Sequence, residues 1–492
     1  MSHRSAFSAA LLCLVLTPQA IRAQTALPKQ TLKPNGIVLH NEKAGETESF
    51  SGLFSDGIFY GRLRSNNFYF RWKTEDAKHA VQYVGAVGAS FVFDSARYEG
   101  FDFGAGLYGS QAFFNESDDP VAALKPGKDT LSRYDFVNTG NKSMAVIAQA
   151  WLRYAGLEAT EFIFGRQLVD TFYTKSNDTK MIPNTFDGLF VTTEAVADTR
   201  MRVGWFYEQK LRDHTQGHAV LMYGDANSSS HLMPQWSEND DSAMHRGLTY
   251  TALKAAGKPT DAPLITGDFR NTSVENLKID AAFYVVPQLL SQVMGEVNYA
   301  IAAGEWTITP GARYIHQFDL GAGKVGGASY TGDAAGYDDP NSLESDMIGL
   351  RLLAEKGLYR FNLAFTQVLD EADLVTPWRG FPTAGYTRSM GVYNWRANTK
   401  SYRFEVKRNA NGTGMYKTLF VQASLLYIDT DEGKKTGYHM FDEIYPYIGF
   451  VQNLPSLPAL QWKLRLGYAH FLDSETADYD YLDSRFELNY LF

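Results

Sequence analysis

The sequence predicts an all-β chain that closes into a transmembrane antiparallel β-barrel of about 18 strands, with 16 as the alternative count. Segments that alternate apolar and polar residues fill nearly the whole chain, aromatic residues make up 14% of it, and it ends in an amphipathic strand with a terminal Phe492. After the first 23 residues, no apolar run approaches the roughly 18 to 20 residues that a membrane helix requires. Lipid cannot hydrogen-bond a backbone, so a spanning sheet has to close on itself.

The alternation has the period of a β-strand. Ile348, Leu350 and Leu352 share one face, whereas Arg351 and Glu355 lie on the other. A soluble sheet would show the same pattern in any single strand, and composition alone leaves a soluble sandwich or barrel open. Many such strands in succession favour the membrane barrel. We expect strands near 57–70, 83–97, 101–114, 144–155, 160–168, 188–196, 200–213, 263–272, 277–287, 292–301, 305–318, 346–356, 358–369, 400–408, 416–428, 441–452, 459–472 and 481–492.

The connections between these strands alternate in length. Glu99-Gly100 and Ala197-Asp198 are tight, whereas 115–143 and 214–262 are long. Outer-membrane barrels have short periplasmic turns and long extracellular loops, and we expect the same asymmetry here. Within the longest loop, 244–257 is a candidate short helix.

The chain divides into three predicted parts: a signal peptide at 1–23, a segment at 24–56 that leads into the barrel, and the barrel at 57–492. Cys13 is the only cysteine and lies in the signal, so disulfides cannot stabilise the exported chain. The formal charge of −9 becomes −11 once the signal is removed, which argues against nucleic acid as a partner. We expect an integral protein of the outer membrane of a Gram-negative bacterium.

The last strand carries a pattern of its own. Phe486, Leu488, Tyr490 and the terminal Phe492 share one face. Such an ending is typical of the signal that the bacterial barrel-assembly machinery reads, and an accidental amphipathic strand is the alternative. The expected partners are therefore this machinery, outer-membrane lipid and lipopolysaccharide.

Four motifs, in their order along the chain, resemble the OprD-type porins, also called Opr-family porins. The first strand contains LRSNNFYFR (63–71), and a later strand contains FGRQ (164–167). A loop then closes with MIPNTFDG (181–188), and NLKIDAAFY (276–284) follows a tight turn. The resemblance implies an outer-membrane channel of 18 strands, narrowed by inward-folded loops, that passes small hydrophilic solutes passively. Carboxylate-bearing solutes, amino acids and short peptides are the implied cargo, and a homotrimer stays open.

In such a channel a ladder of basic residues in the lumen replaces the water that an anion loses. Strand phase gives the candidates, of which Arg64 alone lies on a family motif. The alternative is that these charges merely solvate the wall and pair with carboxylates such as Glu405. The predicted ladder comprises Arg62, Arg64, Arg153, Arg313, Arg351, Arg360, Arg403, Lys407, Lys463 and Arg465.

The resemblance also places a constriction loop after the FGRQ strand. Loop residues often serve as surface or packing groups, and that reading stays open for each candidate. The predicted constriction residues are Arg166, Tyr173, Asp178, Asn184, Thr185 and Asp187, joined by Trp378 and Arg379 from a later loop.

No sequence motif of a hydrolase, a nucleotide-binding loop or a metalloprotease occurs, so we expect no enzyme and no cofactor. His214 and His218 stand four apart without a third ligand at a suitable spacing, and we predict no metal site from them. Calcium binding by the acidic loops is left open. The competing functions are a barrel enzyme and an adhesin or structural barrel.

Overall fold

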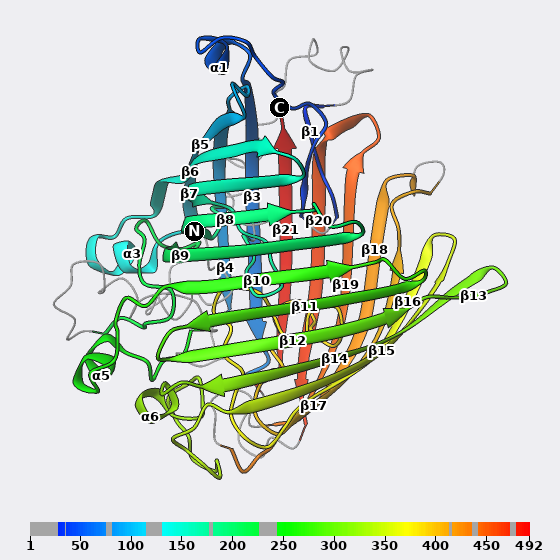
Figure 1. Ribbon diagram of the computed structural model, residues 1–492. Helices are drawn as coiled ribbons and strands as arrows, with labels where there is room; N and C mark the ends of the chain where they lie inside the picture. The colour runs from blue at the N-terminus through cyan, green and yellow to red at the C-terminus, as the bar shows by residue number, and fades with distance from the viewer. Residues whose placement is uncertain are drawn as a thin grey trace, which may run out of the picture.

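The wall of the molecule is one antiparallel sheet that closes on itself (Figure 1). The computed structural model describes residues 28–34, 36–74, 81–114, 130–176, 181–225, 244–412, 416–434, 441–472 and 479–492. Eighteen strands form the wall, because β13 (Ile301–Ala303) continues β12 along the same partner, β14. The predicted fold class and strand count are therefore confirmed.

The strands lie within a few residues of the predicted segments, including those with the weakest alternation. They are β3 (Ile58–Trp72), β4 (Gln82–Asp94), β5 (Phe101–Phe114), β6 (Ser143–Leu157), β7 (Thr160–Gln167), β8 (Thr185–Thr193), β9 (Thr199–Lys210), β10 (Leu264–Asn271), β11 (Leu277–Val286), β12 (Leu290–Tyr299), β14 (Trp306–Asp319), β15 (Ser345–Lys356), β16 (Tyr359–Val368), β17 (Thr399–Arg408), β18 (Leu419–Asp429), β19 (Glu443–Leu454), β20 (Leu457–Phe471) and β21 (Tyr481–Leu491).

The barrel closes between its last and first strands. β21 pairs with β3 from Tyr481 opposite Trp72 to Leu491 opposite Arg62. Beyond β21, the backbone N–H of Phe492 donates to the carbonyl oxygen of Gly61 at 2.9 Å, and the N–H of Gly61 donates back at 2.8 Å. The chain terminus is thus part of the seam, so no strand edge is left open there.

The outward phase of the strands forms an apolar belt. Leu350 pairs with Phe365, and Phe404 pairs with Leu425, all on the outer surface. Leu350 and Leu425 are each 52% exposed, as a core residue of a soluble sheet would not be. Phase is preserved because a shift of one residue would turn every side chain to the other face. The outward positions of β21 are Leu482, Ser484, Phe486, Leu488 and Tyr490.

The two ends of the barrel differ as expected. Tight turns close one end, where Glu99, Asp198 and Asn276 adopt positive φ angles of 49°, 53° and 62°. Long loops follow β5, β7, β9, β14 and β16 at the other end. The described part of the chain has four short helices outside the wall strands: α1 (Gly52–Ser55), α3 (Arg133–Thr139), α5 (Tyr250–Ala255) and α6 (Gly323–Gly326). The helix α5 falls inside the segment predicted to be helical.

A separate small sheet precedes the wall. β1 (Gln30–Leu32) pairs only with β2 (Val38–His40), and both belong to the segment that the sequence assigns to the approach to the barrel. The predicted signal peptide lies outside the described residues. No helix in the described part of the chain is long and apolar enough to cross a membrane.

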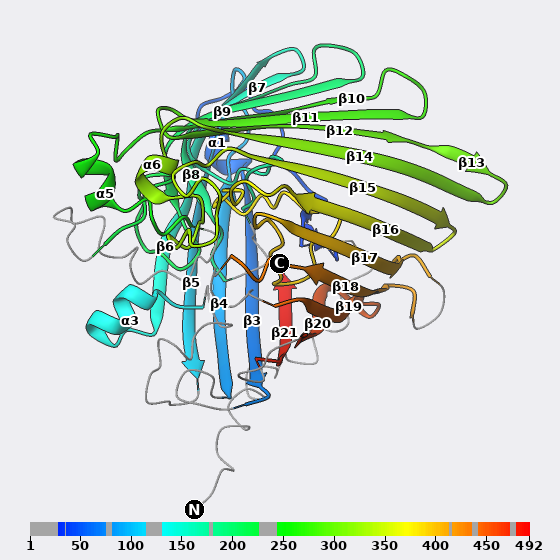
Figure 2. The same cartoon turned by 90° about the horizontal axis from the view of Figure 1, so that it is seen from below.

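Buried apolar side chains gather inside the barrel, where long loops fold inward. Val375 and Trp378 of the β16–β17 loop (369–398) pack with Tyr173 of the β7–β8 loop (168–184). In Figure 2 the yellow chain of the β16–β17 loop lies within the ring of strands. The interior is therefore partly filled by loops, and the spaces between them decide what can pass.

Candidate functional site

Two loops meet inside the barrel and form a partition across part of the lumen. Thr174 of the β7–β8 loop pairs with Arg379 of the β16–β17 loop in an antiparallel bridge. The N–H of Lys175 donates to the carbonyl oxygen of Trp378 at 2.9 Å. The two loops thus support each other, and neither crosses the lumen alone.

Aromatic packing stabilises this partition. The rings of Tyr173 and Tyr284 meet edge to face at 4.9 Å between centroids, and those of Tyr284 and Trp378 at 4.7 Å. The hydroxyl of Tyr284, on wall strand β11, donates to the carbonyl oxygen of Val375 at 2.6 Å. The indole N–H of Trp378 donates to the carbonyl oxygen of Val220 at 2.7 Å. Because all three rings are fully buried, they pack the partition and do not face a solute.

Arginines of the wall hold the β16–β17 loop through its backbone. Arg313 on β14 donates from Nη1 to the carbonyl oxygens of Pro382 at 2.6 Å and Ala384 at 2.9 Å. Arg351 on β15 donates from Nη1 to the carbonyl oxygen of Gly385 at 3.2 Å. A guanidinium can serve several acceptors at once because its five N–H groups form a rigid fork. These contacts fasten the loop to the wall.

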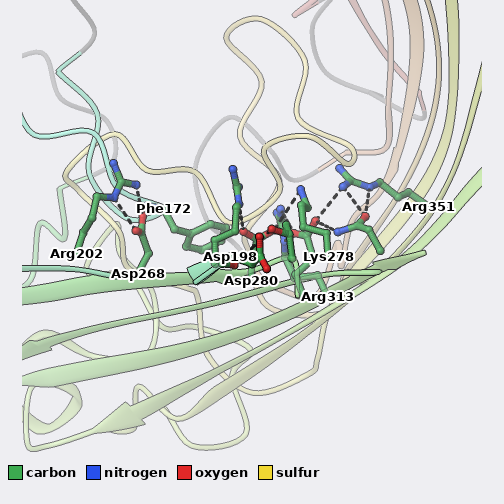
Figure 3. Close-up of polar contacts among 12 residues, drawn as sticks. Phe172, Asp198, Arg202, Asp268, Lys278, Asp280, Arg313 and Arg351 are labelled. Carbon is green, nitrogen blue, oxygen red and sulfur yellow. Dashed lines mark hydrogen bonds and ion pairs between the residues drawn. The ribbon is translucent and has the colours of Figure 1, made fainter. Parts of the chain in front are cut away.

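One carboxylate joins the two arginines. Glu296 on β12 accepts from Nε of Arg313 at 2.7 Å and from Nη2 of Arg351 at 2.9 Å. Asn298 donates to the same carboxylate at 2.8 Å. The ring of Tyr386 lies 4.3 Å from the Arg313 guanidinium and 4.6 Å from that of Arg351. Figure 3 shows the two arginines at one end of a row of charged side chains on the inner wall.

Below the partition the lumen opens into a cavity of about 1050 Å³. Strands β9 to β15 supply most of its charged side chains, the β7–β8 loop supplies Asp170 and Lys175, and Asp94 comes from β4. Seven basic side chains face five carboxylates, an excess of two positive charges. The basic residues are Lys175, Arg200, Arg202, Arg270, Lys278, Arg313 and Arg351, and the carboxylates are Asp94, Asp170, Asp268, Asp280 and Glu296.

Most cations of strands β9 to β11 are paired. Arg202 donates from Nε to Asp268 at 2.7 Å. Arg270 donates from Nε to Asp280 at 2.6 Å, and Lys278 approaches the same carboxylate at 3.2 Å. The labelled row in Figure 3 begins with the Arg202–Asp268 pair. These pairs keep the carboxylates neutralised on the cavity wall.

Arg200 differs from its neighbours. Register places it directly opposite Arg270, and like charges in that position destabilise a sheet. No hydrogen bond or ion pair joins Arg200 to another described residue, and its buried Nε has no hydrogen-bond partner. Nearby, the Lys175 ammonium donates to the carbonyl oxygen of Thr171 at 2.6 Å, and burial lowers the pKa of Lys175. Arg200 therefore stands in the cavity without a carboxylate bonded to it directly, although Asp268 and Glu194 lie close enough to act on its charge.

The structure places all ten residues of the predicted ladder on the inward phase of their strands. Arg62 donates to Oδ1 of Asn489 at 2.8 Å, and Arg64 lies 5.6 Å from the ring of Tyr108. The six other ladder residues, apart from Arg313 and Arg351 with their shared Glu296, each form an ion pair with a carboxylate. These pairs are Arg153 with Asp102, Arg360 with Glu355, Arg403 and Lys407 with Glu405, and Lys463 and Arg465 with Glu487.

The predicted constriction residues do not form one group. Tyr173, Trp378 and Arg379 belong to the partition, and all three are buried there. Asn184 and Thr185 are buried where the β7–β8 loop enters β8. Asp178 lies outside the described residues. The remaining two, Arg166 and Asp187, bond to each other: Nε of Arg166 donates to Oδ1 of Asp187 at 2.9 Å. In the register of β6 and β7, Arg166 lies beside Ala150, which is exposed on the outer face.

Sequence reasoning missed the cations on β9 and β10. Arg200, Arg202 and Arg270 line the cavity, but none of them was among the predicted ladder residues. The signal was present, because Met201, Val203 and Trp205 alternate with them on the outward phase of β9. The short, glycine-containing β10 obscured the phase of its neighbour Arg270.

The two spaced histidines form a buried pair in the loop after β9. The rings of His214 and His218 lie 4.8 Å apart. Burial and the nearby Lys210 lower the pKa of His214 to about 3, so the ring is neutral. Among the described residues no cluster of three or more metal-binding side chains occurs.

The fold is similar to those of several solved outer-membrane proteins. OpdK of Pseudomonas aeruginosa, solved with vanillate, has 14% identity and a TM-score of 0.62, covering 88% of this chain and 98% of that one. OccK9 (OpdG) of the same organism has 14% identity and a TM-score of 0.66, covering 90% and 99%. A BenF-like porin of Pseudomonas fluorescens Pf-5 has 13% identity and a TM-score of 0.63, covering 90% and 100%.

No protein-family model and no curated protein sequence matches the chain. At such low identity the likeness concerns the three-dimensional arrangement of the chain. The resemblance that the sequence motifs indicated is confirmed at that level: the chain has the fold of these outer-membrane porins.

Proposed function

We propose that the chain is a passive porin of the OprD type in the outer membrane, and that it favours small anionic solutes. The outward belt suits lipid, and the closed wall leaves a charged cavity inside. The structural neighbours include a porin by its printed name. Passive diffusion needs only a continuous aqueous path with sites too shallow to trap the solute.

The observation that supports an anion preference is that Arg200 faces the cavity without a carboxylate bonded to it among the described residues. It shares the cavity with Arg270 directly opposite, and a passing anion would relieve the repulsion between the two guanidiniums. A carboxylate suits this pair best because a guanidinium binds it with two parallel hydrogen bonds. Solutes that carry a carboxylate, including amino acids and short peptides, are therefore the proposed cargo. OpdK was solved with vanillate, an anion of this kind.

The test is the reversal potential of single channels in a salt gradient. Arg200→Glu reverses the charge at this position, and Lys324→Glu makes the same change on α6, at an exposed loop position outside the cavity. In a roughly tenfold potassium chloride gradient we expect Arg200→Glu to move the reversal potential by on the order of 10 mV toward cation selectivity. Lys324→Glu should leave it near the wild-type value. Equal shifts in both variants would remove Arg200 from the solute path.

A non-transport barrel, either an adhesin or structural barrel or a barrel enzyme, is the alternative. The same bilayer experiment separates the two classes. A correctly folded protein that inserts and stays silent would favour the alternative, because it would show that the loops seal the lumen. Steady current would support the porin.

We also propose the route to the membrane. Residues 1–23 would be cleaved on export, and residues 24–56 would lead into the barrel that begins at residue 57. The outward Phe486, Leu488 and Tyr490, with the terminal Phe492, would be read by the barrel-assembly machinery before the belt meets lipid and lipopolysaccharide. Mass spectrometry of the mature protein would locate the cleavage site. Native electrophoresis of the extracted protein would distinguish a monomer from a homotrimer.

A further inference from the structure

The hairpin formed by β1 and β2, described at residues 30–34 and 36–40, lies inside the barrel without joining its wall. Each of its strands has three residues, and they pair only with each other. The hairpin contacts the inner side of β20 and β21 at the end of the barrel with the tight turns. Figure 1 shows β1 beside β20, close to the end of the chain. Outer-membrane barrels keep this end in the periplasm.

Among the described residues, side chains hold the hairpin to the wall, and no ladder of backbone hydrogen bonds joins the two. Gln461 donates from Nε2 to the carbonyl oxygen of Leu32 at 2.8 Å. The hydroxyl of Tyr60 donates to the carbonyl oxygen of Glu42 at 2.8 Å. Neighbouring wall strands, by contrast, share continuous ladders of seven or more residue pairs along most of the barrel. The hairpin is therefore far less firmly held than any wall strand, and a segment with few backbone bonds belongs to the low-stability part of a structure.

The tip of the hairpin faces the cavity that holds Arg200. Gly36, Ile37 and Val38 line it on one side, and Arg270 and Lys278 line it on another. Ile37 is 53% exposed, so an apolar side chain projects into this space. A solute that leaves the cavity at the tight-turn end has to share the cross-section with the hairpin.

The segment that follows the hairpin is clamped at the rim. The N–H of Thr47 donates to the carbonyl oxygen of Arg97 at 2.8 Å, and the N–H of Arg97 donates to that of Gly45 at 2.9 Å. The N–H of Ala96 donates to the carbonyl oxygen of Leu53 at 3.1 Å. The residues between hairpin and clamp end at Gly45, where an added Cβ atom would meet no other atom within 4 Å. One end of the segment is thus fixed by backbone hydrogen bonds, whereas in the described part of the chain the hairpin end is bonded to the wall through side chains.

We infer that the hairpin is an internal gate that narrows the periplasmic exit of the lumen and limits the current through it. The inference rests on the proposed channel. It predicts that the tip lies in the ion path, and that the clamp beyond Gly45 does not.

A charged group attached to the tip tests this directly. The only natural cysteine is Cys13, so Ile37→Cys in a Cys13→Ser background carries a single thiol. A negatively charged methanethiosulfonate is added to open single channels of the full-length protein. We expect a stepwise loss of on the order of a third of the open-channel current, because the added group occupies the narrowed path. Removal of the adduct with a reducing agent should restore the current.

Phe50→Cys is the matched control. Phe50 is 68% exposed and precedes α1, which lies beyond the ends of the strands in Figure 1. Its modification should change the current by less than about a tenth. Complete labelling of Ile37→Cys, shown by mass spectrometry, with no change in current would overturn the inference. Wild-type channels that conduct no ions would instead overturn the proposed function.

Deletion of residues 28–41 provides a second test. The clamp at 45–53 stays, and the strands of the wall are untouched. We expect a larger single-channel current, about 1.5-fold or more, since the exit is widened. An unchanged current from a correctly folded deletion variant would contradict a gate at this place.

Discussion

Replacing Arg313 with methionine should release the β16–β17 loop from the barrel wall. Arg313 donates to the carbonyl oxygens of Pro382 and Ala384, and its guanidinium faces the ring of Tyr386. Methionine has similar length and no charge, so it fills the space without making these bonds. Glu296 keeps Arg351 as its partner, so the change leaves no unpaired carboxylate on the wall.

The expected loss follows from the bonds removed. A hydrogen bond from a charged group contributes about 1.5 to 3 kcal/mol, so two of them hold the loop by at least about 3 kcal/mol. The stacking with Tyr386 adds about 0.5 to 2 kcal/mol. A loss of about 3 kcal/mol raises the equilibrium constant for opening roughly 100-fold, because each 1.4 kcal/mol is a factor of ten.

Hydrogen exchange measured by mass spectrometry reports this opening. The amide of Ala384 donates to the carbonyl oxygen of Phe381 at 2.9 Å, and that of Tyr386 donates to Thr383 at 3.1 Å. Both amides should exchange roughly 100-fold faster in Arg313→Met.

The control is Arg360→Met, which breaks only a half-exposed pair with Glu355 at 3.6 Å. Its loop amides should keep their wild-type protection. Equal protection in the two variants would refute the conclusion that Arg313 holds the loop.

Three further outcomes are expected. Acid should loosen the loops at His245, whose Nδ1 accepts the Gly247 N–H at 3.2 Å. Burial lowers the pKa of His245 to about 4, below its ordinary value of about 6.5. The neutral ring therefore contributes about 3 kcal/mol of stability above pH 6.5, and this contribution is lost as the pH falls toward 4. In His245→Gln, hydrogen exchange of the loops should lack this dependence on pH. Asp373→Ala removes the acceptor of the Tyr337 hydroxyl and should speed limited proteolysis of the loops. Unchanged cleavage would argue against a role of Asp373 in holding the loops together. Deletion of Phe492 should lower the heat-modifiable barrel recovered from membranes several-fold; wild-type recovery would exclude a role in assembly.

Most of the wall could be predicted from the sequence because period and phase are local properties. Leu350 and Arg351 occupy opposite faces in any β-strand, and a membrane decides which face is outside. Even β10, with weak alternation, lies where its neighbours require a strand. The closure of β21 on β3 follows from the physics of an unpaired edge in lipid.

The interior could be predicted only in part, because it depends on contacts between distant segments. Strand phase correctly turned Arg313 and Arg351 inward. Strand phase could not show that the two guanidiniums donate to backbone carbonyl oxygens of residues 382, 384 and 385, since these bonds depend on the path of a loop. For the same reason Tyr173 and Trp378 were expected beside a solute and instead pack against Tyr284. The hairpin of β1 and β2 had no signal beyond the sequence Pro-Asn-Gly between two short apolar stretches.

The central claim is that lipid covers the outer face of the sheet, while the inner face lines a lumen that inward-folded loops fill in part. Spin labels on cysteines introduced one at a time along β16, in a Cys13→Ser background, test it most directly. If the chain forms the barrel in membranes, labels at Leu363 and Phe365 should be accessible to oxygen dissolved in lipid. Labels at the inward Asn362 and Thr366, which the β16–β17 loop covers, should not be, and a label at the partly exposed, inward Arg360 should be accessible to a water-soluble nickel complex. Equal accessibility at neighbouring positions, without this alternation, would contradict the account.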